Sequence, residues 1–143
     1  MLVSQILKDK GDLVFTISPS ETVEAVAALL FSRRVGAMIV VDQDGSVVGI
    51  VSERDIVRAV AAEGASALVR TISHYMTAEV HIAEIDETVD ALLGRMTDRR
   101  VRHLPVLLKG RLVGIVSIGD LVKHKISEVT AEAEGLRAYI VSG

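Results

Sequence analysis

The segment GIVSERDI at residues 49–56 returns later in the chain as GIVSIGDL at residues 114–121. Each copy joins an apolar run to a serine that is followed three residues later by an aspartate. An apolar run favours a buried strand, and a serine with an acid three residues on is typical of a helix N-terminus. Each copy therefore predicts a strand that passes directly into a helix.

The similarity extends beyond these segments and indicates an internal repeat. ETVEA at residues 21–25 is matched by ETVDA at residues 87–91 with an offset of 66 residues, whereas the two GIVS segments are offset by 65. The missing residue falls at the turn that contains Gly45 in the first half and Gly110 in the second. A length change confined to a turn is expected of a structural repeat, because turns tolerate it.

Each half predicts the order strand, helix, strand, strand, helix. The first helix has apolar residues at i, i+3, i+4 and i+7, and the turn between the next two strands is short enough for an antiparallel hairpin. In the first half the expected elements are strand 13–17, a helix from 20–21, strands 37–41 and 47–51, helix 52–62, and a connector, 63–76, with a helical turn at 65–70.

The predicted strands are apolar on both faces, and a unit of roughly 60 residues is marginal by itself. We therefore predict an α+β fold of two tandem βαββα repeats related by a pseudo-twofold axis. The first repeat with its connector occupies residues 1–72, and the second, with a C-terminal helix, occupies residues 73–143. Residues 127–134 are expected to form a solvated helix that packs on a partner subunit.

The composition excludes several classes of protein. The chain has 143 residues, 50% of them hydrophobic, and a formal net charge of −3, so neither disorder nor nucleic-acid binding is expected. It has no cysteine, which excludes disulfides and cysteine zinc sites and agrees with a reducing, cytoplasmic location. The longest apolar run, residues 25–31, is far below the roughly twenty residues of a membrane span, and no signal peptide is expected.

Self-association is expected, whereas catalysis is not. The mean hydropathy of +0.42 with only 3% aromatic residues predicts more apolar surface than one small subunit covers, hence a homodimer. The four histidines lack metal-ligand spacing, and no nucleophile elbow, Walker A or dinucleotide motif is present. The length also leaves no room for a catalytic domain beside two repeats. We therefore expect neither an enzyme nor a metal site.

The two GIVS segments, together with RHLPV at residues 102–106, resemble the signature of CBS domains. Their tandem order resembles a CBS pair, or Bateman module, and the segments 6–11 and 136–140 resemble the stand-alone bacterial members. The resemblance covers nearly the whole chain, and the two copies make it specific. It implies a flat, disc-like module whose clefts between the repeats bind adenosine compounds as regulatory ligands. AMP and NAD are the leading candidates, followed by ATP, ADP and S-adenosylmethionine.

The resemblance also implies which residues bind the nucleotide. In the family, the aspartate holds the ribose hydroxyls and the serine lies near the ribose or phosphate, which points to Ser52, Asp55, Ser117 and Asp120. The strand before the first helix lines the adenine pocket, and the basic segment at 102–103 faces phosphates. The further site residues are therefore Thr16, Ile17, Gly36, Ala37, Arg54, Ile82, Arg102, His103 and Pro105.

Several of these residues also have a purely structural interpretation. Ser52 and Asp55 would form a capping box that stabilises the helix by about 1 kcal/mol without a ligand. Arg54 would be exposed in the first helical turn, and Arg102 with His103 would be solvated at a strand entry. Lys10 either lies in a loop or approaches a phosphate. Because residues 102–103 align with Gly36 and Ala37, the two clefts cannot be equivalent.

Two functions remain open from the residues and the resemblance. The leading one is a dimeric sensor that binds an adenine nucleotide and is read by an unknown regulated protein. The alternative is a ligand-independent dimerisation scaffold with empty or degenerate clefts. The first copy has Gly36 and Ala37 in place of the basic residues Arg102 and His103, and this favours the scaffold function for one of the two clefts.

Overall fold

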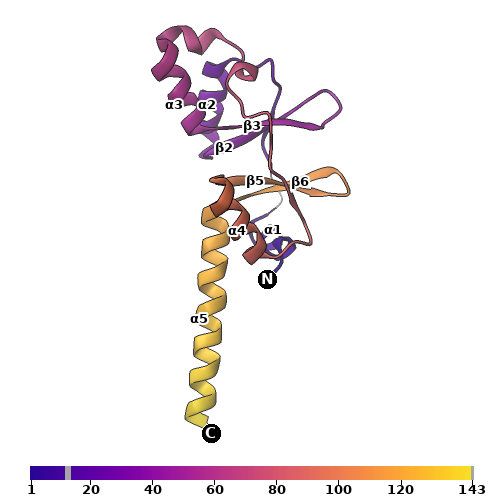
Figure 1. The fold of residues 1–143 in the computed structure, drawn as a ribbon, viewed down its shortest axis with the longest axis vertical. Coiled ribbons are helices and arrows are strands. Elements are labelled where there is room, and N and C mark those ends of the chain that lie inside the picture. Colours follow the sequence, from indigo (N-terminus) through magenta and orange to yellow (C-terminus); the bar gives the residue numbers. More distant parts are fainter. Residues whose placement is uncertain (12–13, 143) are drawn as a thin grey trace. The chain divides into compact units, whose positions relative to one another are not determined.

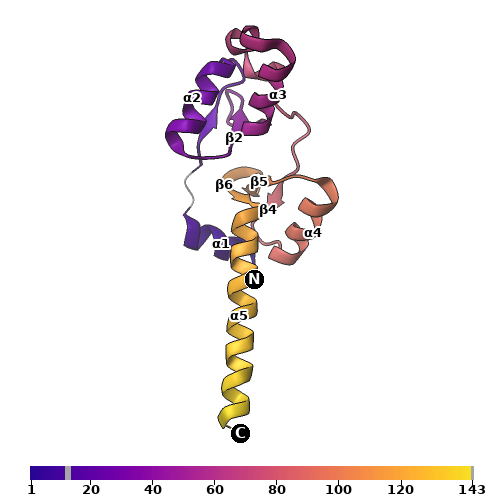
Figure 2. The same cartoon turned by 90° about the vertical axis from the view of Figure 1, so that its left-hand side faces the viewer.

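The computed structural model describes residues 1–11 and 14–142, whose elements are shown in Figures 1 and 2. The described residues form a mixed α/β fold with two sheets of three strands each and five α-helices. The chain divides into two compact units, each built around one of the predicted repeats. One unit contains Met1–Asp12, Ile82–Lys109 and Val113–Gly143, and the other contains Leu13–His81 and Gly110–Leu112.

The unit of the first repeat follows the predicted order of elements. Strand β1 runs parallel to β2, and β2 pairs with β3 in the predicted antiparallel hairpin. Two short 3-10 helices follow α3, so the helical turn expected in the connector is present. The elements are β1 (Thr16–Ile17), α2 (Val23–Arg33), β2 (Ala37–Val41), β3 (Val47–Ser52), α3 (Glu53–Glu63), η1 (Gly64–Val69) and η2 (Ile72–His74).

Two predicted boundaries in this unit need correction. Helix α2 begins at Val23 and not at Ser20, because Thr22 is its N-cap and accepts a hydrogen bond of 3.1 Å from the backbone amide of Ala25. Strand β1 contains only Thr16 and Ile17 among the described residues, and the predicted first strand residue, Leu13, lies outside them. The remaining strand and helix bounds agree with the prediction to within about one residue.

The apolar stripe predicted for α2 faces the core of this unit. Val23 and Val26 are fully buried and Leu30 is nearly so. They pack with residues of all three strands and of η2, so the helix covers the sheet as amphipathic periodicity predicts. The buried cluster consists of Ile17, Val23, Val26, Leu30, Met38, Val40, Val51 and Ile72.

The unit of the second repeat has the same order of elements. Its sheet has the order β4-β5-β6, with β4 parallel to β5. Thr88 caps α4 as Thr22 caps α2, accepting a 3.1 Å hydrogen bond from the amide of Ala91. The elements are β4 (Ala83–Glu84), α4 (Val89–Arg99), β5 (His103–Leu108), β6 (Arg111–Ser117) and α5 (Ile118–Ser142). The repeat inferred from the sequence therefore extends to the helix caps.

An N-terminal helix, α1 (Val3–Lys10), completes the core of this second unit. Val3 and Ile6 are fully buried, and Leu7 is 6% exposed. Leu7 lies against the backbone of Gly114 in β6, where an added Cβ would come within 2.6 Å of the leucine Cδ2. Gly114 therefore leaves the space that α1 needs to pack on the sheet. These residues share one buried cluster with Leu92 and Leu104.

The last helix, α5, continues well beyond the point where it packs on its unit. Leu121, in its first turn, is fully buried, whereas every described residue from 131 onward is exposed. Figure 1 shows this C-terminal part of α5 continuing alone, away from β5 and β6. Among the helices of the described part of the chain, none is long and apolar enough to cross a membrane.

Candidate nucleotide site

The Ser-x-x-Asp segment of the first repeat lies where β3 passes into α3. Ser52 ends the strand and is the N-cap of the helix. Its backbone amide donates to Asp55 Oδ2 at 2.9 Å. In return, the Asp55 amide donates to the Ser52 hydroxyl oxygen at 3.4 Å. The capping box inferred from the sequence is therefore confirmed. The second carboxylate oxygen, Oδ1, accepts no hydrogen bond from the described residues and lies 4.0 Å from Arg58 Nη1 in an ion pair.

The second repeat builds the same box at the start of α5 and adds a lysine. The Ser117 amide donates to Asp120 Oδ2 at 2.9 Å, and the Asp120 amide donates to the Ser117 hydroxyl at 3.1 Å. Lys10 Nζ lies 2.6 Å from the same Asp120 oxygen and donates to the carbonyl of Ile115 at 2.9 Å. Lys10 is the last residue of α1, so the loop position considered for it is wrong.

The lysine also lowers the pKa of the second carboxylate. Burial raises the pKa of Asp120, but the hydrogen bonds from Lys10 and from the Ser117 amide lower it by more. The pKa of Asp120 therefore lies below its ordinary value, and the carboxylate is ionised at neutral pH. The two aspartates thus differ chemically, because Asp120 is held by an ion pair with α1 and Asp55 has no lysine partner among the described residues.

Backbone hydrogen bonds bring the segment before each middle strand to the helix start. The amide of Glu53 donates to the carbonyl of Gly36 at 3.0 Å, and the amide of Ile118 donates to the carbonyl of Arg102 at 2.8 Å. Ala37 pairs with Ser52 across the sheet. In the unit of the first repeat, Gly36 and Ala37 therefore lie beside the Ser52–Asp55 box. In the unit of the second repeat, the backbone of Arg102 lies beside the Ser117–Asp120 box.

The difference between the two copies in sequence is also a difference at these helix starts. Arg102 is exposed and His103, the first residue of β5, is half-buried. At the matching positions Gly36 is half-buried and Ala37 is buried. The segment beside one helix start therefore carries two basic residues, and the segment beside the other carries a glycine and an alanine.

The other predicted site residues are distributed over the surface and the core. Thr16 is exposed on β1, Arg54 is exposed in the first turn of α3, and Ile82 is 36% exposed just before β4. The carbonyl of Ile82 accepts a 2.6 Å hydrogen bond from Arg95, which ties this position to α4. Ile17 and Pro105 are buried, so their side chains help to fill the interior.

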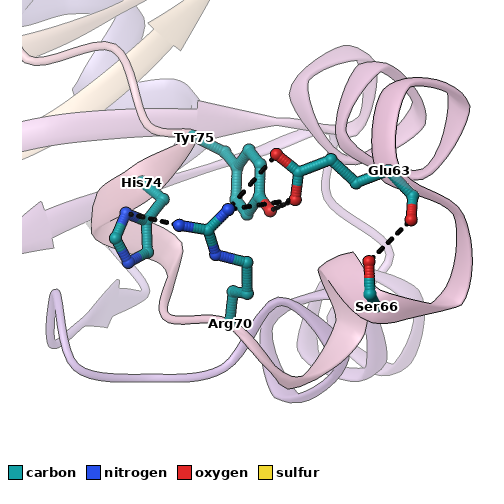
Figure 3. Close-up of polar contacts among 5 residues, drawn as sticks. All are labelled: Glu63, Ser66, Arg70, His74 and Tyr75. Carbon is teal, nitrogen blue, oxygen red and sulfur yellow. Dashed lines mark hydrogen bonds and ion pairs between the residues drawn. The ribbon is translucent and has the colours of Figure 1, made fainter.

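A polar cluster that no sequence motif indicates joins α3 to the connector (Figure 3). Arg70 donates to both carboxylate oxygens of Glu63 at 3.2 and 3.3 Å, and the Tyr75 hydroxyl donates to the same carboxylate. The hydrogen bond from Tyr75 is the main cause that lowers the pKa of Glu63. Because the cluster lies on the surface, we interpret it as a structural link between α3 and the connector and not as a binding site.

The geometry defines a class of protein: a tandem βαββα repeat with a reciprocal serine–aspartate box at the start of one helix in each unit. Among the described residues, no group of three or more acidic or histidine side chains could hold a metal ion. The family model for the CBS domain matches residues 11–62 and 69–127. The chain belongs to the CBS domain family and contains two CBS domains in tandem.

Known proteins with CBS domains are similar over most of the chain. The mitochondrial CBS domain-containing protein CBSX3 of Arabidopsis thaliana is 30% identical over 149 aligned positions, which cover 99% of this chain and 72% of that protein. The crystal structure of the CBS-domain containing protein ATU1752 from Agrobacterium tumefaciens has a TM-score of 0.84 and 43% identity, covering 87% of this chain and 92% of that one.

Two further structural neighbours were solved with adenosine compounds. The CBS domain pair of protein MJ0100, in complex with 5′-methylthioadenosine and S-adenosyl-L-methionine, has a TM-score of 0.80 and 28% identity, covering 90% of this chain and 98% of that one. A CBS domain protein from Pyrobaculum aerophilum, complexed with AMP, has a TM-score of 0.75 and 28% identity, covering 84% and 89%.

Proposed function

We propose that this chain is a regulatory sensor that binds an adenine nucleotide and acts as a homodimer, not as an enzyme. AMP and NAD are the leading ligands, with ATP, ADP and S-adenosylmethionine as further candidates. The observation that carries the proposal is the ionisable aspartate at the start of one helix in each repeat, held by a serine and placed beside the segment that enters the middle strand. Neighbours of this fold bind AMP and S-adenosylmethionine.

The chemistry of these helix starts suits a nucleoside. A carboxylate can accept hydrogen bonds from the two neighbouring hydroxyls of a ribose. Asp55 uses Oδ2 for the capping box, and this leaves Oδ1 to accept a hydroxyl. The helix N-terminus adds a partial positive charge that favours a phosphate. On the second repeat the exposed Arg102 adds a full positive charge to the same end.

The first prediction concerns stability in the presence of ligand. A nucleotide that binds only the folded chain should stabilise it by RT ln(1 + [L]/Kd), about 2.7 kcal/mol at a hundredfold excess over Kd. We therefore expect AMP or NAD at millimolar concentration to raise the melting temperature. The control is inorganic phosphate with free ribose at the same concentrations. No shift with any of the five adenosine compounds would leave the dimerisation scaffold as the function.

The second prediction concerns the lysine on the second aspartate. A ribose that binds Asp120 must share the carboxylate with Lys10, so the ion pair opposes binding. Replacing Lys10→Met should raise the affinity of this site for adenosine, which carries no phosphate, by about tenfold, or 1.4 kcal/mol. Calorimetric titration measures it, with Lys8→Met as the matched control because Lys8 is exposed on the same helix. A loss of adenosine affinity in Lys10→Met would instead make Lys10 a ligand-binding residue.

A further inference from the structure

Helix α5 carries an apolar stripe that the described residues of its own unit leave largely exposed. Successive members are spaced by 4, 3, 4, 3 and 4 residues, the seven-residue period of a coiled-coil seam. Ile126, Leu136 and Ile140 are 61%, 62% and 68% exposed, and the valines at 122 and 129 are 43% and 50% exposed. The stripe, which we call the α5 seam, consists of Val122, Ile126, Val129, Ala133, Leu136 and Ile140.

The contacts of α5 with its own unit end near its middle. Lys125 Nζ lies 3.0 Å from Asp90 of α4, and the N-terminal amino group lies 4.0 Å from Glu128. Every described residue from 131 onward is exposed, and Figure 2 shows the same isolated C-terminal part as Figure 1. Gly135 lies within this part and lowers its helix propensity. Because isolated helices are marginal in water, this segment needs a partner.

We infer that the α5 seam pairs with the α5 seam of a second copy of this chain in a parallel, two-stranded coiled coil. In the heptad register, the a positions hold Ile126, Ala133 and Ile140, and the d positions hold Val122, Val129 and Leu136. At the C-terminal end of the seam, isoleucine at a with leucine at d is the choice of residues that favours two parallel strands. The inference deepens the proposed homodimer, because it assigns the interface to named residues.

The charges beside the seam agree with the parallel arrangement. Glu132 lies at a g position and Arg137 at the following e position, so each Glu132 faces Arg137 of the second copy, and symmetry makes two such pairs. An antiparallel pairing in the register that joins opposite charges would need Lys125 to face Glu132. Lys125 is already held by Asp90 within its own unit. The parallel arrangement therefore uses charges that have no such partner in their own unit among the described residues.

The test uses the absence of natural cysteine from the chain. In a parallel coiled coil the two d residues face each other, close to the Cα separation of about 4.4–6.8 Å that a disulfide spans. Leu136→Cys should therefore form a covalent dimer under mild oxidation. Ala138→Cys, at an f position on the opposite face, is the matched control and should remain non-covalent. Equal cross-linking of the two variants, or none in Leu136→Cys, would overturn the inference.

A second measurement does not depend on oxidation. Light scattering of the parent chain should give twice 15.3 kDa. Leu136→Glu should raise the dimer dissociation constant at least tenfold, and Ala138→Glu should leave it unchanged. A dimer that is insensitive to Leu136→Glu would place the interface elsewhere. Adenosine titration of the same variants measures nucleotide binding separately. A wrong assignment of the interface therefore appears in the dimer dissociation constant, and a wrong assignment of the nucleotide site appears in the adenosine affinity.

Discussion

Asp55→Ala is expected to weaken nucleotide binding at the first repeat by ten- to a hundredfold. The substitution removes the carboxylate that we assign to the ribose hydroxyls, and a hydrogen bond to a charged acceptor contributes about 1.5–3 kcal/mol. Asp120→Ala should have a smaller effect, because Lys10 already occupies that carboxylate. Calorimetric titration of the parent and the two variants with AMP measures the difference.

Controls must distinguish a loss of ribose binding from a loss of the helix cap, because Asp55 is part of the capping box and is also assigned to the ribose. Asp55→Asn keeps one oxygen for the Ser52 amide but loses the charge, so it should retain most of the stability and lose most of the affinity. Glu53→Gln removes a charge from the same helical turn without touching the box, and its affinity should equal that of the parent. If Asp55→Ala and Asp55→Asn lower the melting temperature but leave the nucleotide affinity unchanged, the serine–aspartate segment is only a helix cap.

Ile6→Ala is expected to lower the free energy of unfolding by about 2–5 kcal/mol. Ile6 is fully buried although it is only the sixth residue, and truncation of a buried aliphatic side chain costs transfer free energy and leaves a cavity. Because Ile6 shares its cluster with Leu92 and Leu104, the loss should fall on the second repeat. Urea unfolding at equilibrium measures the change.

The matched control is Val57→Ala in α3. Val57 is 66% exposed, so its truncation removes little buried surface and should change the free energy of unfolding by less than about 0.5 kcal/mol. An equally small effect of Ile6→Ala would mean that α1 does not pack on the second repeat in solution. In that event, Lys10 at the end of α1 would also not be held beside Asp120.

Local spacing in the sequence was sufficient to predict the repeat and its two serine–aspartate capping boxes. The serine and aspartate of each capping box are three residues apart, and such a box depends only on the first helical turn. The hairpin in the first repeat was likewise predictable from a short turn between two apolar runs. The start of α2 was misplaced because Ser20 and Thr22 are both good caps, and only the structure identifies Thr22 as the residue that accepts from Ala25.

The sequence by itself thus determined that the chain has two βαββα repeats, each with a helix that starts at a serine–aspartate box, because these features depend on neighbours along the chain. Only the tertiary structure decided that α1 completes the second repeat and that Lys10 reaches Asp120, 110 positions away. No periodicity reports a contact over that separation. The contact arises because burial of Val3, Ile6 and Leu7 anchors α1, and the end of the helix then carries the lysine to the carboxylate.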